Sequence, residues 1–101
     1  MIQIIWTTTQ NGAAIFFNSK WVEYTGISVE DSYGFGWYHA VHPDDLDAVR
    51  RAWAGIGTDR LELEFRFKKW DGEYRWHLVW FLPLPVFLVS LFMLSLMVVD
   101  S

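Results

Sequence analysis

The chain contains no cysteine, only three prolines, and a single charged residue, Asp100, after Arg75. The absence of cysteine excludes a disulfide framework, a thiolate metal site and any cysteine-linked cofactor. Basic residues are also few: eight lysines and arginines stand against twelve acidic residues, for a net charge of -4. Recognition of phosphates needs a basic face, so this balance argues against a nucleic-acid partner. With 101 residues, the chain has room for one small domain.

Aromatic residues are abundant instead. They make up 19% of the chain, and seven of them are tryptophans, so aromatic packing is expected to dominate the core. The N-terminal stretch of residues 1–5 has no basic region and only a short apolar run, so we expect no signal peptide. Charge is confined almost entirely to residues 1–75, which predicts a soluble module followed by an apolar segment.

The first third of the chain predicts a hairpin followed by two short helices. Residues 2–7 alternate in polarity, Asn11-Gly12 is a strong turn signal, and residues 14–17 supply the returning strand. A short helix is expected over residues 20–24, and a second is expected to begin at Ser28.

The remainder predicts one longer helix and a second hairpin. His42-Pro43-Asp44-Asp45 places proline and two carboxylates at a helix start, where each carboxylate contributes about 1 kcal/mol or less. Residues 61–68 alternate apolar and charged side chains, Asp71-Gly72 predicts a turn, and residues 74–79 form the partner strand. The element order predicts an α+β fold with helices packed on an antiparallel sheet.

At this point the chain resembles the PAS domain family, in the subtype common in bacterial sensor histidine kinases and diguanylate cyclases. The resemblance covers residues 4–83, and residues 1–83 are predicted to form a PAS sensory domain. It implies a five-stranded antiparallel sheet flanked by short helices. The motifs that carry it are Trp6, Asn11-Gly12, Asn18, Trp21, Tyr24-Thr25-Gly26, Gly34-Phe35-Gly36-Trp37, His42-Pro43-Asp44-Asp45, Glu64-Phe65-Arg66 and Asp71-Gly72-Glu73-Tyr74-Arg75-Trp76.

The resemblance implies an input module for signal transduction. Such a module binds a small ligand or dimerises, and it passes the signal to an output domain, as in a sensor kinase or cyclase, that this chain does not contain. The partner is then a second copy of the chain or that output domain. The alternative is a protein-interaction or dimerisation module without a ligand, either free or tethered to a membrane. An enzyme is not expected, because no nucleophile–base pair, phosphate loop or metal cluster is visible.

The apolar segment of residues 84–101 departs from the family pattern, and three interpretations remain open. It is a last strand, a transmembrane helix, or the product of a sequence artefact such as a shifted reading frame. Residues 78–99 contain no charge and reach about 33 Å as a helix, enough for a bilayer core of about 30 Å. However, Pro83 and Pro85 leave only residues 86–99 uninterrupted, about 21 Å.

A membrane span over residues 78–99 also fixes an orientation. Four basic residues precede it: Arg66, Lys68, Lys69 and Arg75. The positive-inside rule then places the sensory module in the cytoplasm, at the cytoplasmic face of the membrane.

Five aromatic residues are candidates for the lining of a ligand cavity, although filling the core of a small domain is the preferred interpretation: Trp21, Tyr24, Trp37, Trp53 and Trp76. No cofactor is identified. The chain lacks the thiol that a cysteine-adduct flavin requires, and His39 or His77 alone does not support a haem site.

Two charged motifs have both a structural and a chemical interpretation. His42-Pro43-Asp44-Asp45 provides an imidazole and two carboxylates for a metal or a proton shuttle, but a helix start explains the same residues and is the preferred interpretation. On the second hairpin, cross-strand ion pairs are expected on the exposed face among Glu64, Arg66, Glu73 and Arg75.

Overall fold

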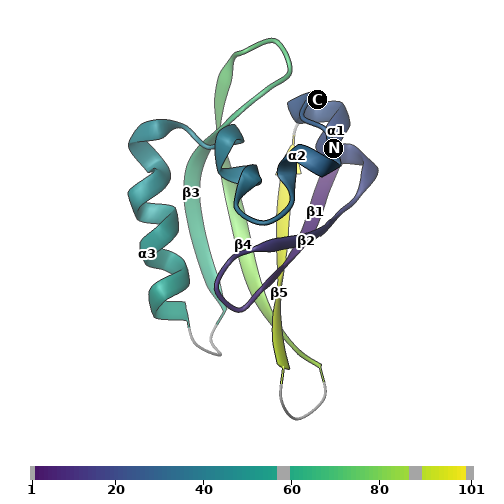
Figure 1. Ribbon diagram of the computed structural model, residues 1–101. Coiled ribbons are helices and arrows are strands. Elements are labelled where there is room, and N and C mark those ends of the chain that lie inside the picture. The colour runs from purple at the N-terminus through teal and green to yellow at the C-terminus, as the bar shows by residue number, and fades with distance from the viewer. Residues whose placement is uncertain (1, 57–59, 87–89, 100–101) are drawn as a thin grey trace.

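The computed structural model describes residues 2–56, 60–86 and 90–99. Within these residues, five strands form a single antiparallel sheet in the order β2-β1-β5-β4-β3 (Figure 1). The strands are β1 (Ile2–Thr9), β2 (Ala14–Phe17), β3 (Leu61–Lys68), β4 (Tyr74–Val86) and β5 (Ser90–Val99).

The helical segments lie between β2 and β3 in the chain, and α3 runs beside β3 (Figure 1). They cover one face of the sheet, which we call the inner face. The α+β fold with short helices on an antiparallel sheet is therefore confirmed. The helical segments are α1 (Ser19–Thr25), α2 (Val29–Ser32), η1 (Gly36–Ala40), η2 (Pro43–Asp45) and α3 (Leu46–Ile56), of which η1 and η2 are 3₁₀ helices.

Tryptophan packing builds the core on the inner face. The Trp6 ring of β1 lies 5.4 Å from that of Trp21 in α1 and 5.5 Å from that of Trp37 in η1. Farther along the sheet, Trp53 of α3 packs edge-on against Phe81 of β4, with ring centroids 4.8 Å apart. Aromatic pairs at these distances add to the free energy of burial itself, so they fix the helices onto the sheet.

The alternation of residues 61–68 has the predicted result. Phe65 and Phe67 are fully buried on the inner face, and Leu61 and Leu63 pack against the same core. Glu62 and Glu64 between them are exposed, because successive side chains of a strand point to opposite faces.

His42-Pro43-Asp44-Asp45 begins a helix, as predicted. The Nδ1 of His42 accepts a hydrogen bond from the Asp44 backbone N–H at 3.1 Å, and Pro43 occupies the first turn. Asp45 has an additional contact that the sequence pattern does not predict. Its carboxylate accepts from Arg66 of β3 at the Nε (3.0 Å), the Nη2 (2.9 Å) and the backbone N–H (2.8 Å).

This contact corrects the predicted ion pairs on the second hairpin. Arg66 pairs with Asp45 rather than across the strands, and its guanidinium also lies 4.7 Å from the ring centroid of Trp76. Arg75 of β4 pairs with Glu73, which lies just before that strand, and both side chains are about half exposed. The sequence pattern shows which side chains share a face, but the loop that carries Asp45 comes from elsewhere in the chain.

The apolar C-terminal segment forms strands. β4 extends past the predicted residues 74–79 to Val86, and β5 lies between β1 and β4, pairing Ile2 with Val99 and Val79 with Met97. In the described part of the chain, no helix has both the length and the apolar character to cross a membrane. The transmembrane-helix alternative is therefore wrong for the described part of residues 78–99.

Topology explains where this segment accommodates two prolines. β5 is paired with β1 on one side and with β4 on the other, so it presents no open edge. β3 ends its pairing with β4 at Phe81, so Pro83 and Pro85 lie where β4 has only β5 as a neighbour. Proline is tolerated on a strand with one open side.

Candidate functional site

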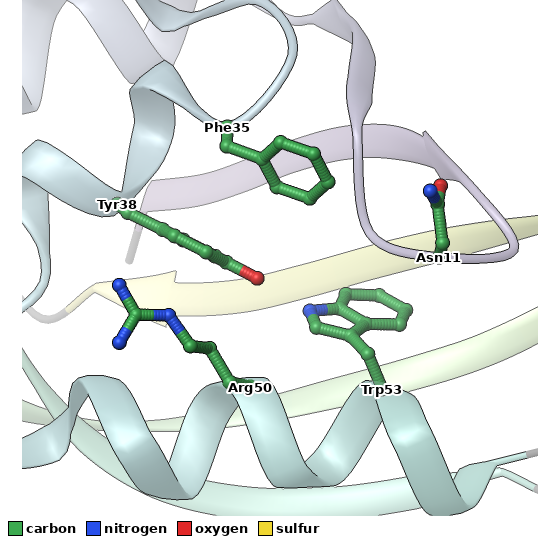
Figure 2. Close-up of a pocket in the computed structure, with 5 residues that line it drawn as sticks. All are labelled: Asn11, Phe35, Tyr38, Arg50 and Trp53. Atoms are coloured by element: carbon green, nitrogen blue, oxygen red, sulfur yellow. The ribbon is translucent and has the colours of Figure 1, made fainter.

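An open pocket of about 380 Å³ lies where three segments meet: the β1–β2 turn, the 3₁₀ helix η1 with the residue before it, and α3. Figure 2 shows its lining. Arg50 and Trp53 rise from α3, Tyr38 and Phe35 lie opposite, and Asn11 closes one end. Arg50 and Trp53 share one face of α3 because they are three residues apart in a helix.

Arg50 supplies the positive charge of the pocket. Its guanidinium carbon lies 5.7 Å from the centroid of the Tyr38 ring, within the range of a cation–π contact. The only ion pair that it forms among the described residues is a 3.5 Å contact with Asp47, and both side chains are more than half exposed. Such an exposed pair is weak, so the guanidinium remains able to bind an anion.

Burial raises the pKa of the Tyr38 phenol, and the nearby Arg50 only partly opposes this effect. Tyr38 therefore remains protonated near neutral pH and offers a hydrogen-bond donor. Figure 2 shows its hydroxyl and the indole nitrogen of Trp53 pointing toward one another.

Trp53 is 7% exposed, and its Nε1 is buried without a hydrogen-bond partner among the described residues. Buried donors in native proteins nearly always have a partner, and an unpaired one costs roughly 1–3 kcal/mol. Trp21 and Trp37 follow the rule, since their Nε1 atoms donate to Ser32 Oγ and to the Gly12 carbonyl, each at 2.9 Å. Trp53 beside the pocket is therefore an exception to this rule within the described residues.

Further unpaired polar atoms lie behind this indole. In the described residues, Trp6 Nε1, Thr8 Oγ1 and Ser95 Oγ are also buried without a hydrogen-bond partner. Ser95 pairs with both Trp6 and Phe81 across the sheet, and Phe81 contacts Trp53. The inner face of the sheet thus contains several buried polar side-chain atoms that have no hydrogen-bond partner among the described residues.

The five aromatic residues that the sequence suggested as cavity lining do not lie together. Of these five, only Trp53 lines the pocket. Trp37 lies behind it, with its ring 6.4 Å from that of Trp53. Trp21 is fully buried under α1, and the Tyr24 hydroxyl is hydrogen-bonded to His77 Nε2 at 2.7 Å. Trp21, Tyr24 and Trp37 therefore fill the core and hold the helices on the sheet.

Trp76 requires a correction. It is 61% exposed and lies on the outer face of the sheet, beneath Arg66. His77 and Val79 are buried and Leu78 between them is exposed, because successive side chains of a strand point to opposite faces. Trp76 thus cannot line a cavity between the sheet and the helices.

Sequence reasoning missed four lining residues: Asn11, Phe35, Tyr38 and Arg50. The spacing of Arg50 and Trp53 on a predicted helix was an available signal for the α3 side of the pocket. No local pattern could bring Asn11 or Tyr38 to this helix, because their approach depends on how the hairpin and η1 pack.

The two histidines considered from the sequence lie in different surroundings. His39 is exposed at the surface, and His77 is buried against Tyr24. Across residues 2–56, 60–86 and 90–99, no group of three or more histidine or acidic side chains is positioned to hold a metal ion.

The family profile of the PAS fold matches residues 14–80, and the chain belongs to this family. An uncharacterised protein of Sinorhizobium fredii is 38% identical over 77 residues, 74% of this chain and 9% of that protein. The peroxide stress-activated histidine kinase mak1 of Schizosaccharomyces pombe is 33% identical over 87 residues, 76% of this chain and 5% of the kinase. The chain thus spans less than a tenth of the length of these relatives.

Solved structures agree in fold. The PAS domain of an HTR-like protein from Haloarcula marismortui has a TM-score of 0.78 at 15% identity, covering 95% of this chain and 79% of that one. The PAS domain of the RpfR quorum-sensing receptor of Cronobacter turicensis, in complex with BDSF, has a TM-score of 0.73 at 22% identity, covering 97% and 94%. At these identities the likeness concerns the fold.

Proposed function

We propose that this PAS domain is a sensory input module that binds a small organic anion in the pocket between α3, η1 and the β1–β2 turn. The observation that carries the proposal is the pairing of a weakly engaged cation, Arg50, with the unpartnered indole donor of Trp53. Aromatic walls with a few directed polar groups are typical of small-molecule sites. The relatives include a stress-activated histidine kinase, which supports a role in signal transduction.

The lining residues define the chemistry of the ligand. Arg50 favours a carboxylate or a similar planar anion, because the guanidinium donors match that geometry. Phe35 and Tyr38 offer aromatic surface to a flat apolar body. The Tyr38 hydroxyl and the Trp53 N–H add two donors, so the preferred ligand has acceptor atoms beside its apolar part.

Binding at this position has a route to the rest of the molecule. α3 begins directly after Asp45, which is joined to Arg66 by three hydrogen bonds. Arg66 in turn lies over Trp76 on the outer face. A ligand that displaces α3 therefore acts on a contact that reaches the opposite side of the sheet, where a second protein can detect it.

The test uses benzoate as an anionic probe and benzamide as its uncharged counterpart. We expect benzoate, but not benzamide, to shift the Trp53 indole N–H signal in a ¹H–¹⁵N spectrum, with the signal assigned through Trp53→Phe. Arg50→Gln should weaken benzoate binding about tenfold or more, which corresponds to the loss of a charged hydrogen bond.

The matched control is Arg51→Gln, because Arg51 is the exposed neighbour on α3 and does not line the pocket. This control should bind benzoate like the unmodified chain. Equal weakening by both substitutions, or equal binding of the two probes, would contradict an anion site at Arg50.

A second function, association with another protein, is favoured by a separate observation. Trp76 and Leu78 on the outer face are 61% and 37% exposed, and solvated apolar side chains grouped on a sheet are typical of contact surfaces. We propose that a second copy of this chain covers them, and that output domains elsewhere in a longer protein receive the signal from such a pair.

A further inference from the structure

The outer face of the β3–β4 hairpin has a charge pattern that is its own complement. Along β3 the outward positions are Glu62, Glu64, Arg66 and Lys68, two acids followed by two bases. If a second copy of this strand faces the first in the antiparallel direction, each acid meets a base. Self-complementarity of this kind is what a two-fold interface requires, since residue i then contacts j and j contacts i.

The neighbouring strand has the same centre of symmetry. The β3 pattern reverses about Phe65, and Phe65 pairs with His77 of β4. The outward residues on either side of His77 are Trp76 and Leu78, both exposed apolar side chains. A two-fold axis lying between the facing sheets along this row therefore brings Trp76 of one copy onto Leu78 of the other.

We infer that this chain forms a two-fold dimer through the outer faces of β3 and β4, with Glu62 opposite Lys68 and Glu64 opposite Arg66 of the second copy. This inference rests on the association proposed above and adds its geometry. Sheets that pack face to face keep their strands within about 30° of alignment, so the opposed rows stay in contact. The apolar pair at the centre and the charged pairs beside it reproduce the apolar core and polar rim of a protein interface.

The charged side chains are held in positions suited to this role. Trp80 Nε1 donates to Glu62 Oε1 at 2.8 Å, which keeps Glu62 on the outer face. Arg66 uses its Nε and Nη2 on Asp45, and within the described residues its Nη1 forms no hydrogen bond. The guanidinium thus retains a donor for Glu64 of the second copy while Asp45 fixes its direction.

The test is charge reversal followed by rescue. Glu62→Lys places a lysine opposite Lys68 of the second copy at each of the two symmetric pairs. Lys68→Glu likewise places a glutamate opposite Glu62 of the second copy. Sedimentation velocity over a concentration series should show dimerisation about tenfold weaker in each variant at low salt, because the two symmetric surface pairs change from attraction to repulsion. The double variant with both substitutions restores the complement and should dimerise like the unmodified chain.

Mixing the two single variants gives the sharpest result. A heterodimer of Glu62→Lys with Lys68→Glu has an attractive pair at both symmetric positions, so the equimolar mixture should dimerise more tightly than either variant alone. Rescue in trans cannot come from a change in folding. The matched control is Glu23→Lys on α1, which makes the same charge change on an exposed helix away from this face and should leave dimerisation unchanged.

The apolar centre is tested with Leu78→Asp against Val22→Asp. The two wild-type residues have nearly the same exposed fraction, 37% and 38%, but Val22 lies on α1. Only Leu78→Asp should abolish the dimer. If none of these substitutions weakens the dimer, the inferred geometry is wrong and the proposed association of two copies still holds. If the unmodified chain stays monomeric at every concentration, the geometry and the association are both wrong.

Discussion

Asp44 and Asp45 are adjacent and carry the same charge, but their side chains have different surroundings. The Asp44 side chain is 78% exposed, and that of Asp45 is 13% exposed and accepts three hydrogen bonds from Arg66. We expect Asp45→Asn to lower the free energy of unfolding by about 1.5–3 kcal/mol, because hydrogen bonds to a charged group are lost. Asp44→Asn should change it by about 0.5 kcal/mol or less. Urea unfolding monitored by tryptophan fluorescence measures both, and equal effects would contradict this difference.

The same carboxylate gives the stability a pH dependence. The hydrogen bonds from Arg66 are the main cause that lowers the pKa of Asp45 below its usual 3.8. Because the pKa is lower in the folded state, the stabilisation is fully present above the unfolded value and is lost as pH falls through the folded one. The stability difference between the unmodified chain and Asp45→Asn should therefore shrink below about pH 4. Urea unfolding at a series of pH values checks this, and a difference that grows on acidification would contradict it.

Gly12 closes the β1–β2 turn against the pocket residue Trp53. Its φ is +95°, and a Cβ at this position would lie 2.9 Å from the Trp53 ring. Gly72 in the β3–β4 turn has a similar φ of +89° but has nothing within 4 Å of such a Cβ. Gly72→Ala should cost about 1–2 kcal/mol from backbone strain alone, and Gly12→Ala should cost about 1–3 kcal/mol more. Thermal unfolding of the pair measures the difference, and equal costs would show that the turn does not press on Trp53.

At the scale of elements, the position of β5 makes the C-terminal segment indispensable. The sequence order places β5 last, but the sheet places it between β1 and β4. A chain that ends at Val86 would lose both of these pairings and divide the sheet into two hairpins, which are marginally stable by themselves. We therefore expect residues 1–86 to lack cooperative thermal unfolding in circular dichroism, both with and without detergent. Cooperative unfolding of residues 1–86 at a stability near that of the unmodified chain would contradict this role of β5.

Local patterns predicted most elements because the physical cause of each is local. Ser28 accepts a hydrogen bond from the Asp31 backbone N–H and begins α2, as its sequence predicts. Asn18 behaves differently. Its side chain bonds the backbone of Ile5 and Gln3 on β1 instead of the first turn of α1. The backbone of β1 thus competes with the first turn of α1 for the hydrogen bonds of the Asn18 side chain. A pattern of residue spacing along the chain cannot predict the outcome of this competition.

At the scale of the whole molecule, the exposed outer face predicts the behaviour of the purified chain. In detergent-free buffer of low salt, we expect light scattering to give a mass near twice the 11.9 kDa of one chain. Apolar groups such as Trp76 and Leu78 are solvated in a monomer and covered in a pair. A monodisperse species at the monomer mass over the whole concentration range would contradict this expectation.

The sequence by itself determined the α+β class, the two hairpins, the helix start at His42 and the buried face of β3. These features depend on periodicity, turn chemistry and capping, which act over a few residues. It could not decide between a strand and a membrane helix for the apolar segment, because an apolar and uncharged run lacks the alternation that identifies a strand with one solvated face.

Only the tertiary structure decided the pairing of β5, the contact of Asp45 with Arg66, and the side of the sheet on which Trp76 lies relative to Trp53. It also brought Asn11, Tyr38 and Arg50 together at one pocket. Each of these depends on segments that are distant in the chain, and their approach is fixed by how the aromatic core packs. The sequence contains the aromatic residues of that core, and the way they pack determines which distant polar side chains come into contact.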